Sequence, residues 1–259
     1  MSNQQTRDFY ETGWDLSGGV NGDTRRWGDL RPCSVDYVHR SQLRLMSCMP
    51  ASGENFLDVG SGPLDDEDYR AFSKNFRKRY CVDFSQTALD RARQKLGDRG
   101  VYLRGDLLDL DLPPDHFDCV LCSDALFHVE ADLQERSVRK MLTVARPGAP
   151  VVITYTNHRG LVDLVPGFRE LLQVKLPHWA AHPYYHSHPQ DFWRRFEGEA
   201  EVRLHPRRTL ESLVHKYLVP DGEAGRELLE LLYQAEEAHP DFFARYGFYY
   251  TVVLRKRGG

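Results

Sequence analysis

The chain has 259 residues, of which 41% are hydrophobic, so it can bury one sizeable core and has room for an added subdomain. Its 38 acidic and 34 basic residues give a formal net charge of −4, which does not favour a polyanionic partner such as nucleic acid. No segment approaches the roughly 18 apolar residues that span a bilayer, the N-terminus has no apolar signal core, and the five cysteines are an odd number. We expect a cytoplasmic monomer or homodimer with reduced thiols, and neither a nucleic acid nor a membrane as partner.

Residues 1–50 predict a loop-rich flap followed by a helix. Apolar residues have helical spacing only from Val35 to Met49. Before them, residues 9–14 carry more aromatic surface than a solvated tail usually does. We expect Tyr10 and Trp14 to fold back over a ligand, with ordinary packing of the flap as the alternative.

From Asn55 onward, short apolar runs alternate with helical stretches. Strands are predicted at residues 56–59, 79–83, 101–103, 117–122 and 151–155. Between them, one helix begins with Ser85 as its cap and ends near Gly97, and another covers residues 133–145 and stops before Pro147. Strands that alternate with helices indicate a parallel sheet.

The last hundred residues are less regular. They predict helices at 189–196, 210–218 and 223–238 and strands at 200–204 and 248–254. The seven strands together predict an α/β fold, a Rossmann-like, doubly wound and mostly parallel sheet with helical and loop lid elements. We divide it into a flap and helix (1–50), a ligand-binding core (51–157), and the rest of the sheet with an inserted lid (158–259), all within a single overall domain.

Candidate functional residues recur at a regular interval. Gly60, Asp83, Asp106 and His128 are 23, 23 and 22 residues apart, and each follows a predicted strand. In a right-handed βαβ series the carboxyl ends of the strands meet at one edge, where open α/β sheets bind ligands. These four residues are therefore predicted to share one site.

The loop Asp58-Val59-Gly60-Ser61-Gly62 begins this series. Its glycines let backbone approach a ligand closely, although a lone G-x-G is weak evidence because turns also use such pairs. Asp83, about 20 residues further on, can accept both hydroxyl hydrogens of a ribose, or can simply stand at a helix N-terminus beside Ser85.

The residues after Gly62 separate two cofactor classes. Pro63 and Leu64 are followed by four carboxylates, Asp65-Asp66-Glu67-Asp68, where a pyrophosphate would need a helix N-terminus free of anions. A phosphate-free sulfonium cofactor suits acidic surroundings. This favours S-adenosylmethionine over a nicotinamide dinucleotide.

Residues 55–157 resemble the class I S-adenosylmethionine-dependent methyltransferases. The resemblance rests on five segments: Phe56-Leu57-Asp58-Val59-Gly60-Ser61-Gly62-Pro63, Cys81-Val82-Asp83-Phe84-Ser85, Gly105-Asp106-Leu107, Phe117-Asp118-Cys119-Val120 and Ala145-Arg146-Pro147-Gly148. It departs from the family after Gly62, where another glycine is usual, and so the first helix is expected to be delayed or short.

The resemblance implies a role for each matching residue. Gly60 and Gly62 pass under the methionine part of the cofactor, within a loop that includes Asp58 and Ser61. Asp83 holds the ribose hydroxyls and Phe84 lies against adenine. Asp106 with Leu107 meets the adenine amino edge, and Ser123 with the turn to His128 faces the methionine end.

The acceptor side is less defined. His128 is a candidate general base, with a structural or cofactor-contacting role as the alternative. The segment 178–188 contains four histidines and could bind zinc, but Pro183 interrupts the helix that would align the first pair, and so we assign no metal. A substrate wall is the preferred interpretation, made of Tyr155, His158, Tyr184, Tyr185 and His186.

The sequence thus predicts an S-adenosylmethionine-dependent methyltransferase of the EC 2.1.1 type that acts on an oxygen or nitrogen of a small molecule, such as a secondary metabolite. Three alternatives remain: the cofactor has only a structural role in another reaction such as a cyclisation, the acceptor is RNA, or the chain is a nicotinamide oxidoreductase. The basic residues 74–79 are expected on the solvated face of a helix, and 254–257 in an exposed tail.

Overall fold

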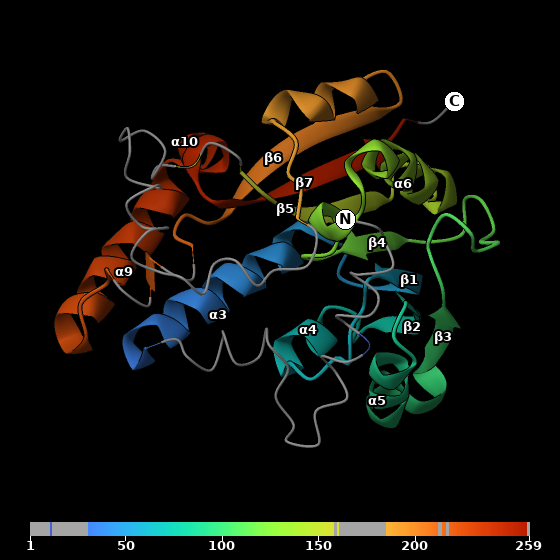
Figure 1. Ribbon diagram of the computed structural model, residues 1–259, viewed down its shortest axis with the longest axis horizontal. Helices are drawn as coiled ribbons and strands as arrows, with labels where there is room; N and C mark the ends of the chain where they lie inside the picture. The colour runs from blue at the N-terminus through green and yellow to red at the C-terminus, as the bar shows by residue number, and fades with distance from the viewer. Residues whose placement is uncertain are drawn as a thin grey trace.

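The computed structural model describes residue 11 and residues 31–157, 160, 185–211, 214–215 and 218–257. These residues form a seven-stranded sheet in the order β3-β2-β1-β4-β5-β7-β6 (Figure 1). The strands are β1 (Gly53–Val59), β2 (Phe76–Asp83), β3 (Gly100–Arg104), β4 (Cys119–Cys122), β5 (Pro150–Thr156), β6 (Ala200–Arg208) and β7 (Tyr249–Lys256). Strands β1 to β5 are parallel, and β7 is antiparallel to both of its neighbours. The predicted mostly parallel α/β sheet is confirmed.

The described α-helices are α3 (Val35–Leu43), α4 (Glu67–Ala71), α5 (Gln86–Leu96), α6 (Ala131–Val144), α9 (Gly222–Ala238) and α10 (Pro240–Tyr246). The Ser85 side chain accepts the N–H of Ala88 at 3.2 Å and so caps α5, which ends at Gly97 with φ 52°. Helix α4 begins only at Glu67 and has five residues. The helix after the glycine loop is therefore both delayed and short, as Pro63 and the acidic run predict.

Both faces of the central strands are covered, as expected for parallel strands. Leu57 of β1 packs on one face in a cluster with Met141 of α6. Its neighbour Phe56 packs on the other face with Leu45 of the 3₁₀ helix η2 (Arg44–Cys48). Because neighbouring residues of a strand face opposite ways, a continuous apolar run such as β4 is buried on both sides.

The basic segment 74–79 is not the surface of a helix, and that prediction was wrong. Residues 76–79 begin β2, where Arg77 is exposed and pairs with Glu54. Arg79 is fully buried and pairs with Asp58 of the neighbouring strand. A basic residue can occupy a core when a carboxylate across the sheet neutralises it.

The C-terminal part differs from prediction in several details. Residues 190–196 form a 3₁₀ helix, η7 (Gln190–Phe196), whose Trp193 and Phe196 are buried in the main core. Helix α10 follows α9 at Pro240, a residue that can begin a helix because it needs no N–H partner there. The predicted helix 210–218 is described only in part, and Val214 and His215 are helical.

Figure 1 shows α3 and α9 side by side next to the sheet, with α5 near β2 and β3. Among the residues described, no helix is both long and apolar enough to cross a membrane. All five cysteines are buried as free thiols.

Candidate functional site

A cavity of about 670 Å³ opens at the edge where the parallel strands end. Its walls come from the segments that follow β1, β2, β3 and β4, from α3, α4 and α6, and from the end of β6. The predicted cofactor residues that line it are Gly60, Ser61, Gly62, Asp83, Phe84, Asp106, Leu107, Ser123 and His128. The fold therefore brings the whole strand-end series into one cavity.

The glycine loop is fixed to the end of β2. The N–H groups of Gly60 and Ser61 both donate to the carbonyl of Val82, at 2.8 and 3.1 Å. Gly60 and Gly62 have φ values of 70° and 58°, in the left-handed region that side chains with a Cβ disfavour. A Cβ on Gly60 would lie 2.5 Å from the Cβ of Ala125, so this position needs glycine for a second reason.

Asp83 is the carboxylate that joins the loop to the next strand. Its Oδ2 accepts the N–H of Gly62 at 2.8 Å, and its Oδ1 accepts the N–H of Ser85 at 2.9 Å. Burial raises the pKa of Asp83 to about 6, although these two N–H groups act in the opposite direction. Each oxygen has a further lone pair, so Asp83 can still accept two hydrogen bonds from a ligand.

The acidic segment 65–68 lines the cavity in an organised form. Asp65 pairs with Arg91 and Lys95 of α5. Asp66 caps α4 and accepts the side-chain N–H of Gln42 at 3.0 Å, and Asp68 pairs with His39 at 2.5 Å. Helices α3 and α5 thus hold this segment from two sides.

Phe84, Asp106 and Leu107 line the part of the cavity beside β2 and β3. Gly105 donates its N–H to the carbonyl of Asp83 at 3.0 Å, and Asp106 Oδ1 accepts the N–H of Leu108 at 2.9 Å. These bonds connect the segment after β3 to the end of β2. The three residues that the resemblance implies for adenine therefore lie in one part of the cavity wall.

Ser123 and His128 line the cavity on the β4 side, together with Asp124, which the sequence analysis did not select. Asp124 has φ 54°, and its N–H donates to Thr154 Oγ1 at 2.7 Å. Its Oδ1 accepts from Thr154 Oγ1 at 3.0 Å and from Arg207 Nη1 at 2.6 Å. Burial by itself would raise the pKa of Asp124, but the charge and hydrogen bonds of Arg207 and the Thr154 hydroxyl hold it below its usual range.

Arg207 reaches the cavity because β6 contains a bulge. Pro206 pairs with Tyr250 of β7 and Arg208 pairs with Tyr249, which leaves Arg207 as the extra residue. A bulge re-aims the side chain at its position. Here the re-aimed guanidinium lines the cavity and holds Asp124.

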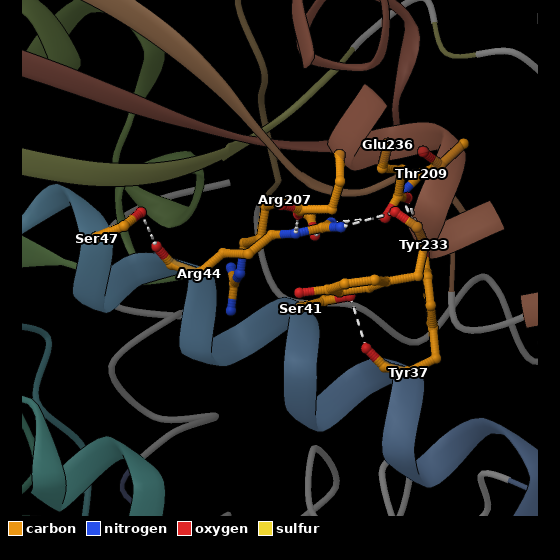
Figure 2. A network of polar contacts seen from close by, with 9 residues as sticks. Tyr37, Ser41, Arg44, Ser47, Arg207, Thr209, Tyr233 and Glu236 are labelled. Carbon is orange, nitrogen blue, oxygen red and sulfur yellow. Dashed lines mark hydrogen bonds and ion pairs between the residues drawn. The ribbon is translucent and has the colours of Figure 1, made fainter. Parts of the chain in front are cut away.

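A buried carboxylate supports the bulge from behind (Figure 2). Glu236 of α9 has 0% side-chain exposure, and its Oε1 accepts the O–H of Tyr37 at 2.6 Å and the N–H of Thr209 at 3.0 Å. Its Oε2 accepts Arg44 Nη1 at 2.6 Å, and the same nitrogen donates to the carbonyl of Arg207 at 3.0 Å. Residues of α3, η2 and α9 therefore fix the backbone around the bulge.

Several predicted site residues do not line the cavity. Asp58 is fully buried, with its carboxylate occupied by Arg79 and Tyr69. Tyr155 is buried and donates its O–H to Gln134 Oε1 at 2.5 Å. Tyr185 lies against the His128 ring, with centroids 6.0 Å apart, and the N–H of His186 donates to the carbonyl of Phe127 at 2.8 Å. The remaining predicted residues, Tyr10, Trp14, His158 and Tyr184, lie outside the described residues.

The cavity also contains residues that sequence reasoning missed, namely His39, Gln42, Tyr69, Asp124 and Arg207. Asp124 could have been found, because it lies in the turn just after β4, next to Ser123. Arg207 gave no comparable signal, since a bulge in an edge strand leaves no clear pattern in one sequence. His39 and Gln42 have the i, i+3 spacing of one helix face.

Comparison with known proteins shows what the central part of the chain is similar to. Residues 57–153 match a family model described as a methyltransferase domain. This segment lies within residues 55–157, whose motifs resemble the class I S-adenosylmethionine-dependent methyltransferases. The matched segment runs from the end of β1 through most of β5, the part of the sheet that carries the strand-end series.

Among individual relatives, the chain is similar to norajmaline N-methyltransferase of Rauvolfia serpentina, with 42% identity over 57 residues. That segment is 22% of this chain and 19% of the relative, so the match spans about a fifth of the relative's length.

Likeness of fold extends over nearly the whole chain. The methyltransferase in a complex with the Trm112 methyltransferase activator of Haloferax volcanii has a TM-score of 0.60 and 16% identity, over 98% of each chain. Magnesium protoporphyrin IX methyltransferase of Synechocystis PCC 6803 has a TM-score of 0.58 and 16% identity, over 99% of this chain and 100% of that one. At these identities the likeness concerns the fold alone.

Proposed function

We propose that the chain binds S-adenosylmethionine in this cavity and transfers its methyl group to an oxygen or nitrogen of a small molecule. The observation that carries the proposal is the position of Asp83 beside the glycine loop. The N–H groups of Gly62 and Ser85 fix its two oxygens, and the remaining acceptor positions suit the paired hydroxyls of a ribose.

The charges of the cavity fit this cofactor. Six aspartates line it: Asp65, Asp66, Asp68, Asp83, Asp106 and Asp124. Among the described lining residues, Arg207 is the only lysine or arginine, and it pairs with Asp124. A sulfonium cation is favoured by such a lining, whereas the pyrophosphate of a dinucleotide is repelled.

Each part of the cofactor has candidate residues. The loop of Gly60 and Gly62 suits the methionine part, and Asp83 the ribose. Phe84, Asp106 and Leu107 form the wall for adenine, and Ser123 and His128 face the methionine end. When bound, the cofactor supplies a methyl group that its sulfonium already activates. The protein's task is then to hold an acceptor in line and exclude water.

The acceptor is proposed to bind between α3, the turn after β4 and the bulge of β6, which line the rest of the cavity. His128 is proposed to take a proton from it. Tyr185 and Phe127 pack against the His128 ring and restrict its orientation, with centroids 6.0 and 4.7 Å away. A secondary metabolite is our proposed acceptor, and the five buried free thiols agree with a cytoplasmic location.

Calorimetric titration with S-adenosylmethionine and S-adenosylhomocysteine tests the cofactor site. The wild type is expected to bind both with micromolar-scale affinity, and Asp83→Ala and Gly60→Arg to abolish binding. Glu67→Ala is the matched control, because Glu67 is a neighbouring acid whose side chain is 94% exposed. Binding like that of the wild type in both site variants would refute the assignment. Release of S-adenosylhomocysteine with a panel of small amines, phenols and alcohols then tests methyl transfer.

A further inference from the structure

Asp124 and Asp83 lie on opposite sides of the glycine loop. Asp83 ends β2 and Asp124 follows β4, and these two strands flank β1. The loop after β1 touches the β4 side, since a Cβ on Gly60 would lie 2.5 Å from that of Ala125. If Asp83 takes the ribose and the loop takes the methionine part, Asp124 stands on the far side, toward the acceptor.

Asp124 is the more accessible member of an ion pair that lines the cavity. Its side chain is 37% exposed, whereas that of its partner Arg207 is only 9% exposed. Both residues line the cavity. The left-handed φ of 54° and two hydrogen bonds with Thr154, one from the Asp124 N–H and one to its Oδ1, fix this residue in place. Strained backbone of this kind persists where the surrounding structure enforces it.

The support for this pair is extensive. The bulge that delivers Arg207 is supported by Glu236 of α9, Arg44 of η2 and Tyr37 of α3 (Figure 2). Arg44 is itself stacked on the Tyr233 ring, with the guanidinium carbon 4.0 Å from the centroid. Buried hydrogen bonds of this kind favour one arrangement of the network. The network thereby helps to hold the Asp124 carboxylate in one position on the proposed acceptor side.

We propose that Asp124 faces the methyl-transfer point, stabilises positive charge there, and thereby selects an amine as the acceptor. This inference rests on the proposed function and names the acceptor class. With an amine, the nitrogen lone pair forms the new N–C bond while the methyl–sulfur bond breaks. One positive charge passes from sulfur to nitrogen, and the ammonium proton then passes to His128, the proposed base, which also lines the cavity.

A preorganised carboxylate favours this reaction because positive charge persists next to it throughout. An oxygen acceptor must instead lose its proton to become a strong nucleophile, and the resulting anion is repelled by Asp124. The same carboxylate therefore assists an amine and opposes a phenolate or alkoxide.

The test compares two cofactor analogues that differ in charge at the transfer point. S-adenosylhomocysteine has a neutral sulfur, and sinefungin carries an amino group in place of the methylated sulfonium. Their dissociation constants are measured by calorimetry on the full chain. We expect Asp124→Asn to weaken sinefungin binding about tenfold and to change S-adenosylhomocysteine binding by less than about twofold, as loss of one nearby charge implies.

Two further variants make the result specific. Asp83→Asn is expected to weaken both analogues alike. The double variant Asp124→Asn/Arg207→Gln removes the pair without leaving an uncompensated guanidinium, and it is expected to retain the selective loss of sinefungin. If the double variant has the same ratio of sinefungin affinity to S-adenosylhomocysteine affinity as the wild type, the inference is overturned. If the wild type binds neither analogue, the proposed function itself fails.

Discussion

Arg79 and Asp58 form an ion pair that is wholly buried between β2 and β1, with 0% exposure of both side chains. Arg79 Nη2 and Nε donate to Asp58 Oδ2 at 2.6 and 3.0 Å, and the Tyr69 hydroxyl donates to Oδ1 at 3.0 Å. Since Tyr69 also lines the cavity, this pair connects the interior of the sheet to the site.

Removing one member of the pair is expected to be costly. Arg79→Met leaves Asp58 as an uncompensated buried charge and should lower the free energy of unfolding by about 3–5 kcal/mol. Arg77→Met, which breaks an exposed pair on the same strand, should cost no more than about 1 kcal/mol. Urea unfolding measures both. The double variant Asp58→Asn/Arg79→Met should lose less than Arg79→Met alone, and an equal or greater loss would show that uncompensated charge is not the cause.

Cofactor affinity is expected to depend on pH through Asp83. Because burial raises its pKa to about 6, the carboxylate that accepts ribose hydroxyls becomes protonated as the pH falls through this value. Below about pH 6, the affinity for S-adenosylhomocysteine should fall as the pH falls. The loss should approach about tenfold for each pH unit. Titrations between about pH 7 and about pH 5 check this. Asp83→Asn should bind weakly with a flatter profile, because the group that changes charge in this range is removed. An unchanged slope in this variant would contradict the assignment.

Alanine substitutions at Gly60 and Gly148 distinguish the effect of a left-handed backbone from the effect of a steric contact. Their φ values are 70° and 77°, but a Cβ on Gly148 meets no atom within 4 Å, whereas one on Gly60 meets Ala125. Gly148→Ala should cost about 1–2 kcal/mol of unfolding free energy and leave cofactor binding intact. Gly60→Ala should cost more and also weaken S-adenosylhomocysteine binding. Equal effects of the two substitutions on binding would mean that the contact with Ala125 is unimportant.

The strand-end side of the cavity could be predicted from the sequence because its rules are local. A residue that follows a parallel strand lies at a known edge of the sheet, and so Gly60, Asp83, Asp106 and His128 could be placed together without coordinates. Pro63 likewise predicted the late start of α4. Asp58 was selected by its position in the glycine motif, yet its side chain points into the core instead of the cavity.

The acceptor half depends on contacts between residues far apart in the chain. Arg207 meets Asp124 from 83 residues away, and Glu236 meets Tyr37 from 199 residues away. No pattern in a single sequence indicates either of these two contacts. Arg79 was misplaced for the same reason, since its neighbours are basic and its neutralising partner lies on another strand.

Different residues hold the two sides of the cavity in place, the glycine-loop side and the side formed by the bulge in β6. The glycine loop is fixed to β2, whereas the carbonyl of Arg207 is held by Arg44 of η2, which Glu236 of α9 holds in turn. Substitutions at Arg44 and Glu236 can therefore alter the position of Arg207 while the hydrogen bonds between the glycine loop and β2 remain. Under the proposed function, a designed change of acceptor specificity is best sought at these two residues.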